Sequence, residues 1–585
     1  MADIGYPIIE QVNYDKNVPD ELNNLVGADV AKRRLLLEYP TVYVIYSPNK
    51  RGGYEVYVGE TNDIDRRTSE HLLEDPKKRE DWKELSFNHD AQMLIIGHHH
   101  FNKSLTMDIE NKMMLYMLST PSVKRLNNRR ENQQNEYYTS DEKEQIFSRI
   151  WRKLRKFNDT LFPVETIVKD SPIFKASPFH DLTMEQERAK EIIIDEVIDA
   201  LLTQKTGQLI LVEGEAGSGK TVLLSTIFYL ISQLKSTIYR PGFDNLNNYL
   251  LVNHKEQLKV YEDIINKLEL NRKNKDTTSS PTHFINQHSE SNKADVVLID
   301  EAHLLLTQGK QSYGGKNQLN DILKRSRVVV AVFDKNQILQ TNEYLEPEQI
   351  KKLEDTAQKK GNLISLTNQL RIHANTKTIS WIRDIVDKGI ITDIPYDKQY
   401  DLRIFDDPVE MYHAIREKDK DETLGVSRLL ATFDWDFNGL HSPKNQNYWM
   451  VTVGNLSLPW NLQINKIKKG RHSKNKLSWI ERPETIGEVG STFTIQGFDL
   501  NYSGLIIGPS VQYRNGHIKF DPSKSKNTNA THLRTLHGKK VPLGQKLLPN
   551  ELNVLLTRGV NGMYIYAVDD ELRAALLKAQ KKINF

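Results

Sequence analysis

The chain has 585 residues, a length that suggests about three to five domains rather than one. Its 80 Lys and Arg residues nearly balance 77 Asp and Glu residues, and the net charge of +3 neither requires nor excludes a nucleic-acid partner. The absence of cysteine excludes disulfides, thiolate zinc sites, iron–sulfur clusters and a cysteine nucleophile. No apolar run reaches about 18 residues and the acidic start does not fit a signal peptide, so we expect a cytoplasmic protein without a membrane partner.

The first part of the chain mixes short strand-like and helical runs. A helical stretch at 28–38 precedes two β-type runs, 41–47 and 55–59, which the turn-rich segment PNKRGG joins into a hairpin. Another strand is predicted at 91–96, and apolar residues at helical spacing predict a helix at 105–118.

Beyond a polar and basic connector, buried-type strands alternate with helical segments, as in a doubly wound sheet. We predict an α/β protein in which a small α+β domain at 1–130 precedes a helical or partly ordered connector at 131–170. Two doubly wound domains follow at 171–360 and 361–585.

The clearest functional signal is a phosphate-binding loop. Gly214-Glu-Ala-Gly217-Ser-Gly219-Lys220-Thr221 fits the pattern G-x-x-x-x-G-K-[ST], and it follows a predicted strand and opens a predicted helix. Glycines let backbone N–H groups surround phosphate oxygens, and the helix N-terminus adds positive potential. We expect Lys220 to reach the β and γ phosphates of a nucleotide and Thr221 to bind Mg²⁺.

An acidic pair, Asp300-Glu301, ends the later strand DVVLID. At the carboxyl end of a strand, Asp300 suits coordination of Mg²⁺ and Glu301 suits activation of the attacking water. Alone, such a pair is usually a helix start. Together with the phosphate loop, it favours nucleotide hydrolysis.

The motif order from about residue 171 to the end resembles superfamily 1 helicases. Leu182-Thr-Met-Glu-Gln186 is similar to the adenine-reading Gln motif, and Asn368-Gln-Leu-Arg371 is similar to the fourth motif, which places Arg371 on the phosphates. Phe333-Asp-Lys-Asn-Gln337 resembles the third motif, whose glutamine senses the γ-phosphate, although the family usually has a small residue where Phe333 stands.

Two further motifs extend this resemblance. Thr492-Phe-Thr494-Ile-Gln496 resembles the fifth motif, which implies that Thr494 and Gln496 touch nucleic acid. Leu555-Leu-Thr-Arg558-Gly resembles the sixth, whose arginine acts as a finger from the second RecA-like domain on the transferring phosphoryl group. Gln496-Gly-Phe-Asp-Leu-Asn-Tyr502 is narrower and resembles the bacterial domain-of-unknown-function family 2075, which is related to the helicase-like part of Schlafen proteins. The short stretches between motifs leave little room for accessory domains. NTP hydrolysis and translocation are therefore better supported by the sequence than unwinding of a duplex.

The first 130 residues carry a second set of motifs. Thr41-Val42-Tyr43 and Tyr57-Val58-Gly59 lie on the predicted hairpin and resemble the paired motifs of GIY-YIG nucleases, with Thr41 in place of the first glycine. The catalytic positions that this resemblance implies are Tyr43, Tyr57, Arg67, His71 and Glu110, with Asn127 or Asn128 as a late polar residue.

These residue types suit metal-dependent phosphodiester cleavage. Arg67 and His71 are four residues apart and share one helix face. Glu110 offers oxygen ligands to Mg²⁺ or Mn²⁺, Arg67 offsets phosphate charge, and a tyrosine helped by the metal or by His71 accepts a proton from water. The alternative is that the tyrosines are core residues and Arg67 is a surface charge.

Other polar segments are candidates for nucleic-acid contact. His98-His-His100 follows a strand, and we expect a polar loop along the nucleic-acid groove rather than a metal site. The run 466–476 has six basic residues and no acid, with Lys468, Lys469 and Arg471 at its centre, and 514–546 has eight basic residues and one acid. Such runs suit phosphate contacts, and the alternative is solvated loops.

The combined expectation is an ATP-dependent nucleic-acid motor fused to a small α+β GIY-YIG endonuclease domain and built on two RecA-like domains. We expect DNA as its substrate, in defence against foreign nucleic acid, including viruses, or in repair. The alternatives are an NTP-gated nucleic-acid-binding switch and an RNA-directed nuclease without unwinding activity.

Overall fold

The computed structural model of this chain describes residues 4–49, 52–73, 88–127, 137–234, 246–270, 277–310, 312–420, 425–439, 441–444, 446–461, 479–480, 482–495 and 497–580. The chain divides into two compact units. The first unit comprises 1–183 and 259–277, and the second comprises 184–258 and 278–585. Within the described ranges, no helix is long and apolar enough to cross a membrane.

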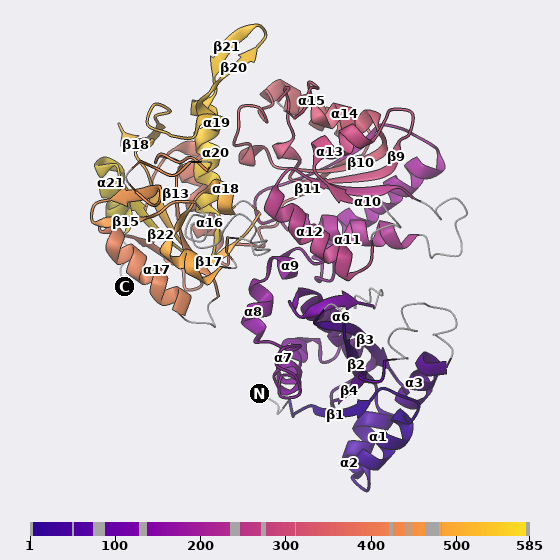
Figure 1. The fold of residues 1–585 in the computed structure, drawn as a ribbon. Coiled ribbons are helices and arrows are strands. Elements are labelled where there is room, and N and C mark those ends of the chain that lie inside the picture. Colours follow the sequence, from indigo (N-terminus) through magenta and orange to yellow (C-terminus); the bar gives the residue numbers. More distant parts are fainter. Residues whose placement is uncertain are drawn as a thin grey trace. The chain divides into compact units, whose positions relative to one another are not determined.

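The first unit contains a mixed sheet with the strand order β1-β4-β2-β3-β5 (Figure 1). Neighbouring strands are antiparallel except for the parallel pair β3–β5. The strands are β1 (Ile8–Asn13), β2 (Thr41–Pro48), β3 (Tyr54–Thr61), β4 (Gln92–Gly97) and β5 (Val123–Leu126). The helices include α1 (Val18–Val26), α2 (Val30–Arg33), α3 (Ile64–Leu73) and α6 (Lys103–Ser119). The predicted hairpin and the predicted helix at 105–118 are confirmed as β2–β3 and α6.

The described part of the expected connector belongs to the core of the first unit. Helix α7 (Lys143–Leu154) is followed by α8 (Glu165–Asp170) and α9 (Pro172–Lys175). On α7, Phe147 and Trp151 are buried, and their rings lie 4.6 and 4.8 Å from that of Tyr116 on α6. Polar residues outnumber the apolar ones in this stretch, so the sequence suggested a linker. The few apolar residues nevertheless recur at helical spacing and form one buried stripe.

The second unit begins with a parallel sheet whose strand order is β11-β6-β10-β9-β7-β8. Helices α10 and α11 lie on one face, and α13, α14 and α15 lie on the other (Figure 1). Its strands are β6 (Gln208–Gly214), β7 (Asn248–Val252), β8 (Thr278–Ser279), β9 (Ala294–Asp300), β10 (Ser326–Phe333) and β11 (Leu363–Leu366). Its helices are α10 (Met184–Leu202), α11 (Lys220–Gln233), α13 (Pro281–Gln287), α14 (Gln318–Lys324) and α15 (Pro347–Lys359). Helix α12 (Lys255–Lys267) begins in the second unit, and its residues from 259 onward belong to the first. Because β11 pairs with β6, this first α/β domain extends past residue 360, where we expected its boundary.

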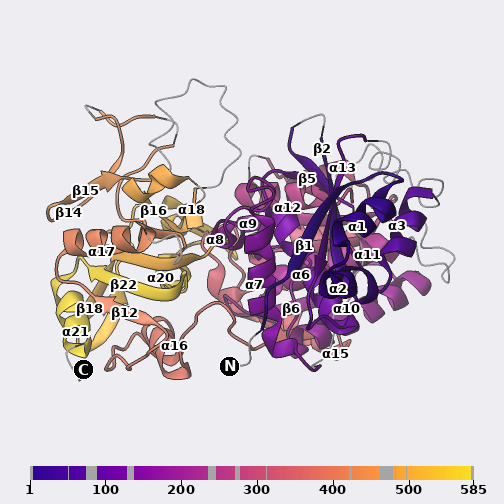
Figure 2. The ribbon, with the colours of Figure 1, turned by 90° about the horizontal axis from the view of Figure 1, so that it is seen from below.

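A second parallel sheet has the strand order β12-β22-β17-β13-β16, with α17 along it (Figure 2). Its strands are β12 (Asp401–Ile404), β13 (Ser427–Ala431), β16 (Val489–Gly490), β17 (Leu500–Ile507) and β22 (Gly559–Ala567). Its helices are α16 (Thr376–Arg383), α17 (Pro408–Lys420), α18 (Thr492–Ile495), α19 (Thr528–Thr531), α20 (Gly544–Leu556) and α21 (Asp570–Gln580). Three hairpins accompany this second α/β domain among the described residues: β14 (Met450–Val453) with β15 (Leu456–Pro459), β18 (Val511–Arg514) with β19 (His517–Phe520), and β20 (Leu533–Leu536) with β21 (Lys539–Pro542).

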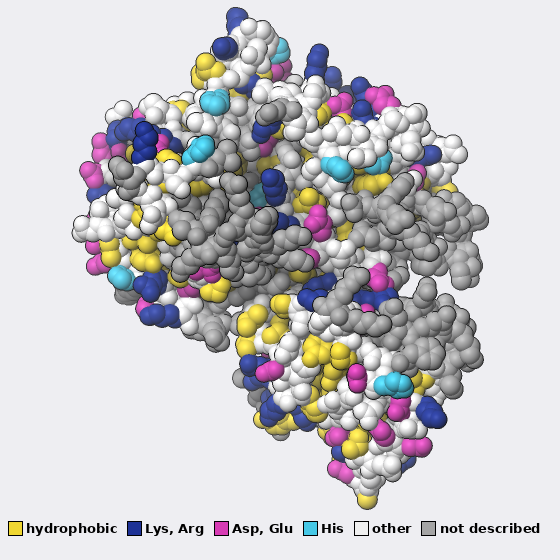
Figure 3. Space-filling view, in the orientation of Figure 1, with side chains coloured by type: hydrophobic (Ala, Val, Ile, Leu, Met, Phe, Trp, Pro, Cys, Tyr) yellow, Lys and Arg dark blue, Asp and Glu magenta, His cyan; other side chains and the backbone are white. Residues whose placement is uncertain are grey.

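The two α/β domains share one apolar cluster. Leu543, Leu547 and Leu548 at the start of α20 are buried in the same cluster as Ile338 and Tyr344 of the first domain. The hairpin β20–β21 projects from this region and has Lys and Arg side chains at its end (Figures 1 and 3). The buried α20 segment therefore fixes the second domain against the loop that follows β10 of the first.

Lys267 at the end of α12 is a buried cation of the first unit. Its Nζ donates hydrogen bonds to the carbonyl oxygens of Leu118, at 2.7 Å, and Thr120, at 3.0 Å, where α6 ends. Burial lowers the pKa of Lys267 to about 7. The C-terminus of α6 attracts a cation, but burial removes water from the ammonium group and so disfavours its charged form.

We expect the free energy of unfolding of the wild type to rise relative to that of Lys267→Met as the pH increases from about 7 to about 10. The folded pKa of about 7 lies below the unfolded value of about 10.4, so the unfolded state binds the additional proton in this window, and stability rises with pH. The slope of the difference is at most about 1.4 kcal/mol per pH unit. Urea unfolding of both proteins at several pH values measures it, and a difference that does not change with pH would contradict the assignment.

Candidate nuclease and nucleotide sites

In the first unit, a close packing of Tyr43 onto Gly59 organises the two tyrosine motifs. Tyr43 on β2 lies directly opposite Gly59 on β3. A Cβ atom at residue 59 would lie 2.4 Å from the Cζ atom and the hydroxyl of Tyr43, so any larger residue would displace the ring. The fully buried Tyr43 ring stacks on Tyr57 with a centroid distance of 6.0 Å. The glycine of the second motif is therefore needed for space, whereas Thr41 is accommodated at the start of β2, where it is buried opposite Thr61.

Helix α3 presents His71 and Arg67 to these tyrosines. The Tyr43 hydroxyl and His71 Nε2 are 2.7 Å apart, and the rings of Tyr57 and His71 lie 5.3 Å apart. Arg67 also donates from Nη1 to Glu70 at 3.1 Å. The one-turn separation of Arg67 and His71 brings both to one helix face, as their spacing predicts.

The electrostatics link the tyrosines to Arg67 and Glu110. Burial raises the pKa of Tyr43 well above its usual value, the nearby Tyr57 and Glu110 raise it further, and the guanidinium of Arg67 opposes the rise. The pKa of Tyr57 is raised for the same reason, burial first. Glu110 on α6 is only 3% exposed. The structure thus gathers the five expected nuclease residues, and the tyrosines are neutral, proton-carrying groups at neutral pH.

The donor set near Glu110 fits a lightly coordinated divalent cation. Among the described residues, no group of three or more His, Asp or Glu side chains is placed to hold a metal. Mg²⁺ commonly uses one or two carboxylates and completes its shell with water and substrate phosphate, so a single buried carboxylate suffices. Bound there, the ion would supply polarisation of a phosphodiester.

The remaining polar candidates of this unit are less closely connected to the tyrosines. Asn127 is buried and its Nδ2 has no hydrogen-bond partner within the described ranges, whereas Asn128 lies outside them. His98 is fully buried, His99 packs on Gly5, and His100 pairs with Glu142. Burial of His98 contradicts the expectation that this segment is a polar loop along a groove, because its ring is used in packing.

In the second unit, the phosphate loop requires its glycines for conformation and space. Gly217 and Gly219 have φ angles of +91° and +75°. A Cβ atom at Gly217 would lie 2.0 Å from Gln369 Oε1, and one at Gly219 would lie 2.1 Å from Gln186 Nε2. The loop is therefore closely covered by both side chains, and Gln186 donates to the carbonyl oxygen of Ser218 at 3.2 Å.

The lysine and the acidic pair converge beside this loop. Lys220 Nζ donates to the carbonyl oxygens of Gly214, at 2.6 Å, and Glu215, at 2.7 Å, and lies 3.6 Å from Asp334. Thr221 Oγ1 donates to Asp300 Oδ2 at 3.2 Å, so the hydroxyl and the carboxylate expected to hold Mg²⁺ are neighbours. These oxygen ligands fit Mg²⁺ with a nucleotide phosphate, and the ion would supply neutralisation of phosphate charge.

Glu301 has the environment of a proton acceptor. Its backbone is left-handed, with φ +51°, which costs about 1–3 kcal/mol and is a frequent feature of active sites. Burial raises the pKa of Glu301 above its usual value, which strengthens the carboxylate as a base. Glu301 Oε2 is buried, lies 3.1 Å from His303 Nε2 and accepts no hydrogen bond from the described residues.

The third and sixth motifs meet at Gln337. Gln337 Nε2 donates to Asp334 Oδ2 at 2.7 Å, and Arg558 Nη2 donates to Gln337 Oε1 at 3.4 Å. Arg558 is 1% exposed, and burial, followed by the charge of Arg371, lowers its pKa to about 9. Arg371 Nε lies 2.6 Å from Asp499 Oδ1, just beyond the fifth motif. The site therefore collects cations from both α/β domains.

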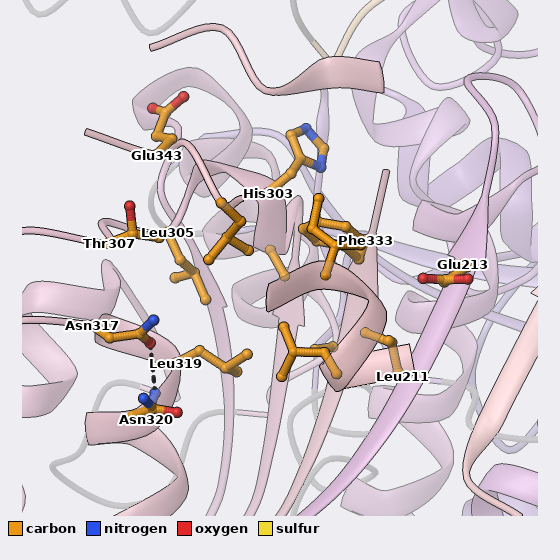
Figure 4. A pocket seen from close by; sticks show the side chains of 15 residues that line it. Leu211, Glu213, His303, Leu305, Thr307, Asn317, Leu319, Asn320, Phe333 and Glu343 are labelled. Atoms are coloured by element: carbon orange, nitrogen blue, oxygen red, sulfur yellow. Dashed lines mark hydrogen bonds between the residues drawn. The ribbon is translucent and has the colours of Figure 1, made fainter. Parts of the chain in front are cut away.

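Phe333 departs from the helicase pattern because its side chain belongs to an apolar cavity. The cavity has a volume of about 40 Å³ and is lined by His303, Phe333, Glu213, Glu343 and neighbouring leucines (Figure 4). Phe333 is 6% exposed and lies in the core cluster. Burial raises the pKa of Glu343 to about 8 and that of Glu213 to about 7.

The expected nucleic-acid residues are only partly described. Thr494 Oγ1 exchanges hydrogen bonds with the backbone of Ser491, whereas Gln496, Lys468, Lys469 and Arg471 lie outside the described residues. In the second basic run, Arg514 pairs with Asp569 and Arg534 is buried with its donors on backbone carbonyl groups. Two of the eight basic residues of this run are thus bound within the protein rather than offered to nucleic acid.

Gln257 is a site residue that the sequence did not reveal. Its Nε2 donates to Asp300 Oδ2 at 2.5 Å, and its side chain is 5% exposed. Gln257 lies on the amphipathic helix α12, where a polar residue at this position has no local signature.

Family comparisons agree with this division of the chain. Residues 207–569 match the family model described as Schlafen group 3, DNA/RNA helicase domain, and residues 39–115 match the GIY-YIG catalytic domain. The uncharacterized protein YPL245W of Saccharomyces cerevisiae is 33% identical over 435 residues, which cover 68% of this chain and 91% of that protein.

Solved structures with detectable similarity include a helicase and an NTPase. The arterivirus nonstructural protein 10 helicase shares 13% identity with a TM-score of 0.26, and the match covers 66% of this chain and 64% of that one. The DExH-box NTPase HrpB of E. coli shares 11% identity with a TM-score of 0.25, over 69% of this chain and 43% of that one. This chain thus spans less than two thirds of either structure.

Proposed function

The chain belongs to the Schlafen group 3 DNA/RNA helicase family, and from that premise we propose that it is an ATP-dependent nucleic-acid motor with a metal-dependent GIY-YIG endonuclease. The observation that carries the proposal is the nucleotide cluster. Lys220, Asp300 and Glu301 come from the first α/β domain, and Arg558 reaches Gln337 from the second.

This arrangement suits hydrolysis coupled to movement. Lys220 and Arg558 offset charge on the β and γ phosphates, and Glu301 accepts a proton from the attacking water. Arg558 belongs to the second α/β domain, so it contacts the γ-phosphate only when that domain lies close to the first. Hydrolysis of the γ-phosphate removes this contact and thereby changes the arrangement of the two domains. Repeated cycles would move the protein along one strand.

The first unit suits cutting of the strand. Arg67 offsets charge on the scissile phosphate, and the Tyr43 hydroxyl takes a proton from the nucleophilic water as it passes its own proton to His71 Nε2. Glu110 would hold Mg²⁺ or Mn²⁺. We propose DNA as the substrate and a role in defence against foreign nucleic acid or in repair, because a motor and a cutter on one chain suit both tasks.

The test is incubation of the full chain with end-labelled single- and double-stranded DNA and RNA, with and without ATP and Mg²⁺. We expect metal-dependent cleavage of DNA and ATP hydrolysis that single strands stimulate. Equal or greater cleavage of RNA would replace the DNA assignment by an RNA-directed nuclease. Absence of both hydrolysis and cleavage would refute the proposal.

A second candidate is an NTP-gated binding switch that does not translocate. It is favoured by the apolar cluster that Leu547 and Leu548 share with the first α/β domain, since this cluster opposes large separation of the domains. Displacement of a blocked end from a single strand in the presence of ATP distinguishes the two. A motor displaces the block, whereas a switch hydrolyses ATP without doing so.

A further inference from the structure

Helix α20 holds the loop of the third motif through two asparagines. Asn550 Nδ2 donates to the carbonyl oxygens of Lys335, at 3.3 Å, and Ile338, at 2.9 Å. Asn553 Nδ2 donates to the carbonyl oxygen of Asn336 at 3.1 Å. The three accepting carbonyl groups flank Gln337 on both sides. The backbone that carries Gln337 is therefore fixed by side chains from the second α/β domain.

The same helix leads into the arginine that contacts Gln337. Arg558 follows the end of α20, is held by hydrogen bonds to the carbonyl oxygens of Val554 and Phe498, and donates to Gln337 Oε1. One rigid element thus sets both the main chain beside Gln337 and the cation opposite its side chain. A shift of the loop relative to α20 would separate Arg558 from Gln337.

Asn553 uses both ends of its amide. While Nδ2 serves the third-motif loop, Oδ1 accepts a hydrogen bond from Arg383 Nη1 at 3.1 Å. Arg383 Nη2 in turn lies 3.5 Å from Glu215 Oε1 in the phosphate loop. The amide supplies its donor and its acceptor from two different atoms, so it can serve both partners at once, and the 1% exposure of Asn553 excludes replacement of either bond by bulk water.

The fold of α20 has other supports than these amides. Leu547 and Leu548 of the same helix are buried in the shared apolar cluster, and Leu552, Val554 and Leu555 are buried as well. Loss of an amide bond therefore changes the loop rather than the helix. The expected consequence is misalignment of Gln337 and Arg558, with the lysine and the backbone N–H groups of the phosphate loop left in place.

We propose that Asn553, supported by Asn550, is a positioning residue for nucleotide hydrolysis: it couples the third-motif loop to the arginine of the sixth motif and, through Arg383, to the phosphate loop. This inference rests on the proposed hydrolysis of ATP. It assigns Asn553 to alignment of the transition state and not to binding of the nucleotide.

The test compares Asn553→Ala and Asn553→Asp with Gln545→Ala in the full chain. Gln545 is a matched control, because it lies on α20 and donates to a carbonyl group, that of Phe520, within its own domain. We expect both Asn553 variants to lower kcat for ATP about tenfold to a hundredfold, the usual effect of a residue that orients an active-site group, with KM unchanged. Asn553→Asp keeps an acceptor for Arg383 but lacks the donor to Asn336. A lower kcat of this variant therefore shows that the hydrogen bond to the third-motif loop is the one that matters.

Binding of a fluorescent non-hydrolysable ATP analogue supplies the second readout, and we expect it to match the wild type. Activity equal to that of Gln545→Ala, or a raised KM with unchanged kcat, would overturn the inference while ATP hydrolysis by the wild type stands. If Asn553→Ala does not fold, Asn550→Ala, which removes two bonds to the same loop, decides by the same criteria. A wild type that does not hydrolyse ATP would instead refute the proposed function.

Discussion

Lys220→Ala is expected to abolish ATP hydrolysis, with or without added nucleic acid. The ammonium group lies among the carbonyl oxygens of the phosphate loop and beside Asp334, where the β and γ phosphates of a nucleotide would arrive. Alanine leaves the loop without its side-chain cation. The matched control is Lys205→Ala, because Lys205 is an exposed lysine of the same α/β domain that pairs with Asp199.

Phosphate release by the two variants and the wild type measures the effect. Retention of wild-type turnover by Lys220→Ala would mean that this loop is not the hydrolytic site. Glu301→Gln gives a second check, since the amide cannot accept a proton from water but preserves the shape of the site. It should still bind the fluorescent nucleotide while hydrolysis stops.

Glu110→Gln is expected to remove metal-dependent cleavage while leaving ATP hydrolysis nearly intact, because the two sites lie in separate compact units. Replacement of the buried carboxylate by a neutral amide removes the charge that would bind the cation. Arg67→Ala should lower the cleavage rate about a hundredfold to a thousandfold, as expected for loss of one group that stabilises transition-state charge. Glu144→Gln is the matched control, since Glu144 is an exposed carboxylate that pairs with Lys112 on α6.

Cleavage of a labelled strand and ATP turnover are measured in the same preparation of each variant. EDTA should stop both reactions of the wild type. Cleavage that persists in Glu110→Gln or in EDTA would rule out the metal mechanism at this site.

The contiguous motifs made the nucleotide site largely predictable. The order of glycines before Lys220, and the position of Asp300 at a strand end, depend on local backbone geometry that a short sequence encodes. The pairing of Tyr43 with Gly59 follows equally from the hairpin register. In these places, local sequence determines the arrangement of the functional groups.

Contacts between distant segments were not predictable in the same way. Gln257 and Asn553 reach the nucleotide site from amphipathic helices, and nothing in their local sequence indicates which buried group each one meets. Strand β11 continues the first sheet because it pairs with β6, far away in the chain. Helix α7 was predicted as part of a connector for a related reason. Its apolar stripe is recognisable as part of the core only from its contact with Tyr116 of a distant segment.

We propose that the nuclease site and the nucleotide site act on the same strand under control of ATP. If both proposed sites are active, each works at high effective concentration on the nucleic acid that the other holds. Arg558, which donates to Gln337 of the first α/β domain, is the residue that we propose to connect nucleotide state to the arrangement of the two domains. ATP should therefore alter the rate or the position of cleavage, and Arg558→Ala should remove this effect while metal-dependent cutting survives.

The direct measurement is a cleavage map on one long single-stranded substrate with ATP, with a non-hydrolysable analogue and without nucleotide. We expect the map with ATP to differ from the other two in cut positions or in rate, and Arg558→Ala to give the nucleotide-free map under all conditions. Identical maps and rates for the wild type in all three conditions would contradict this expectation and would show two independent enzymes on one chain.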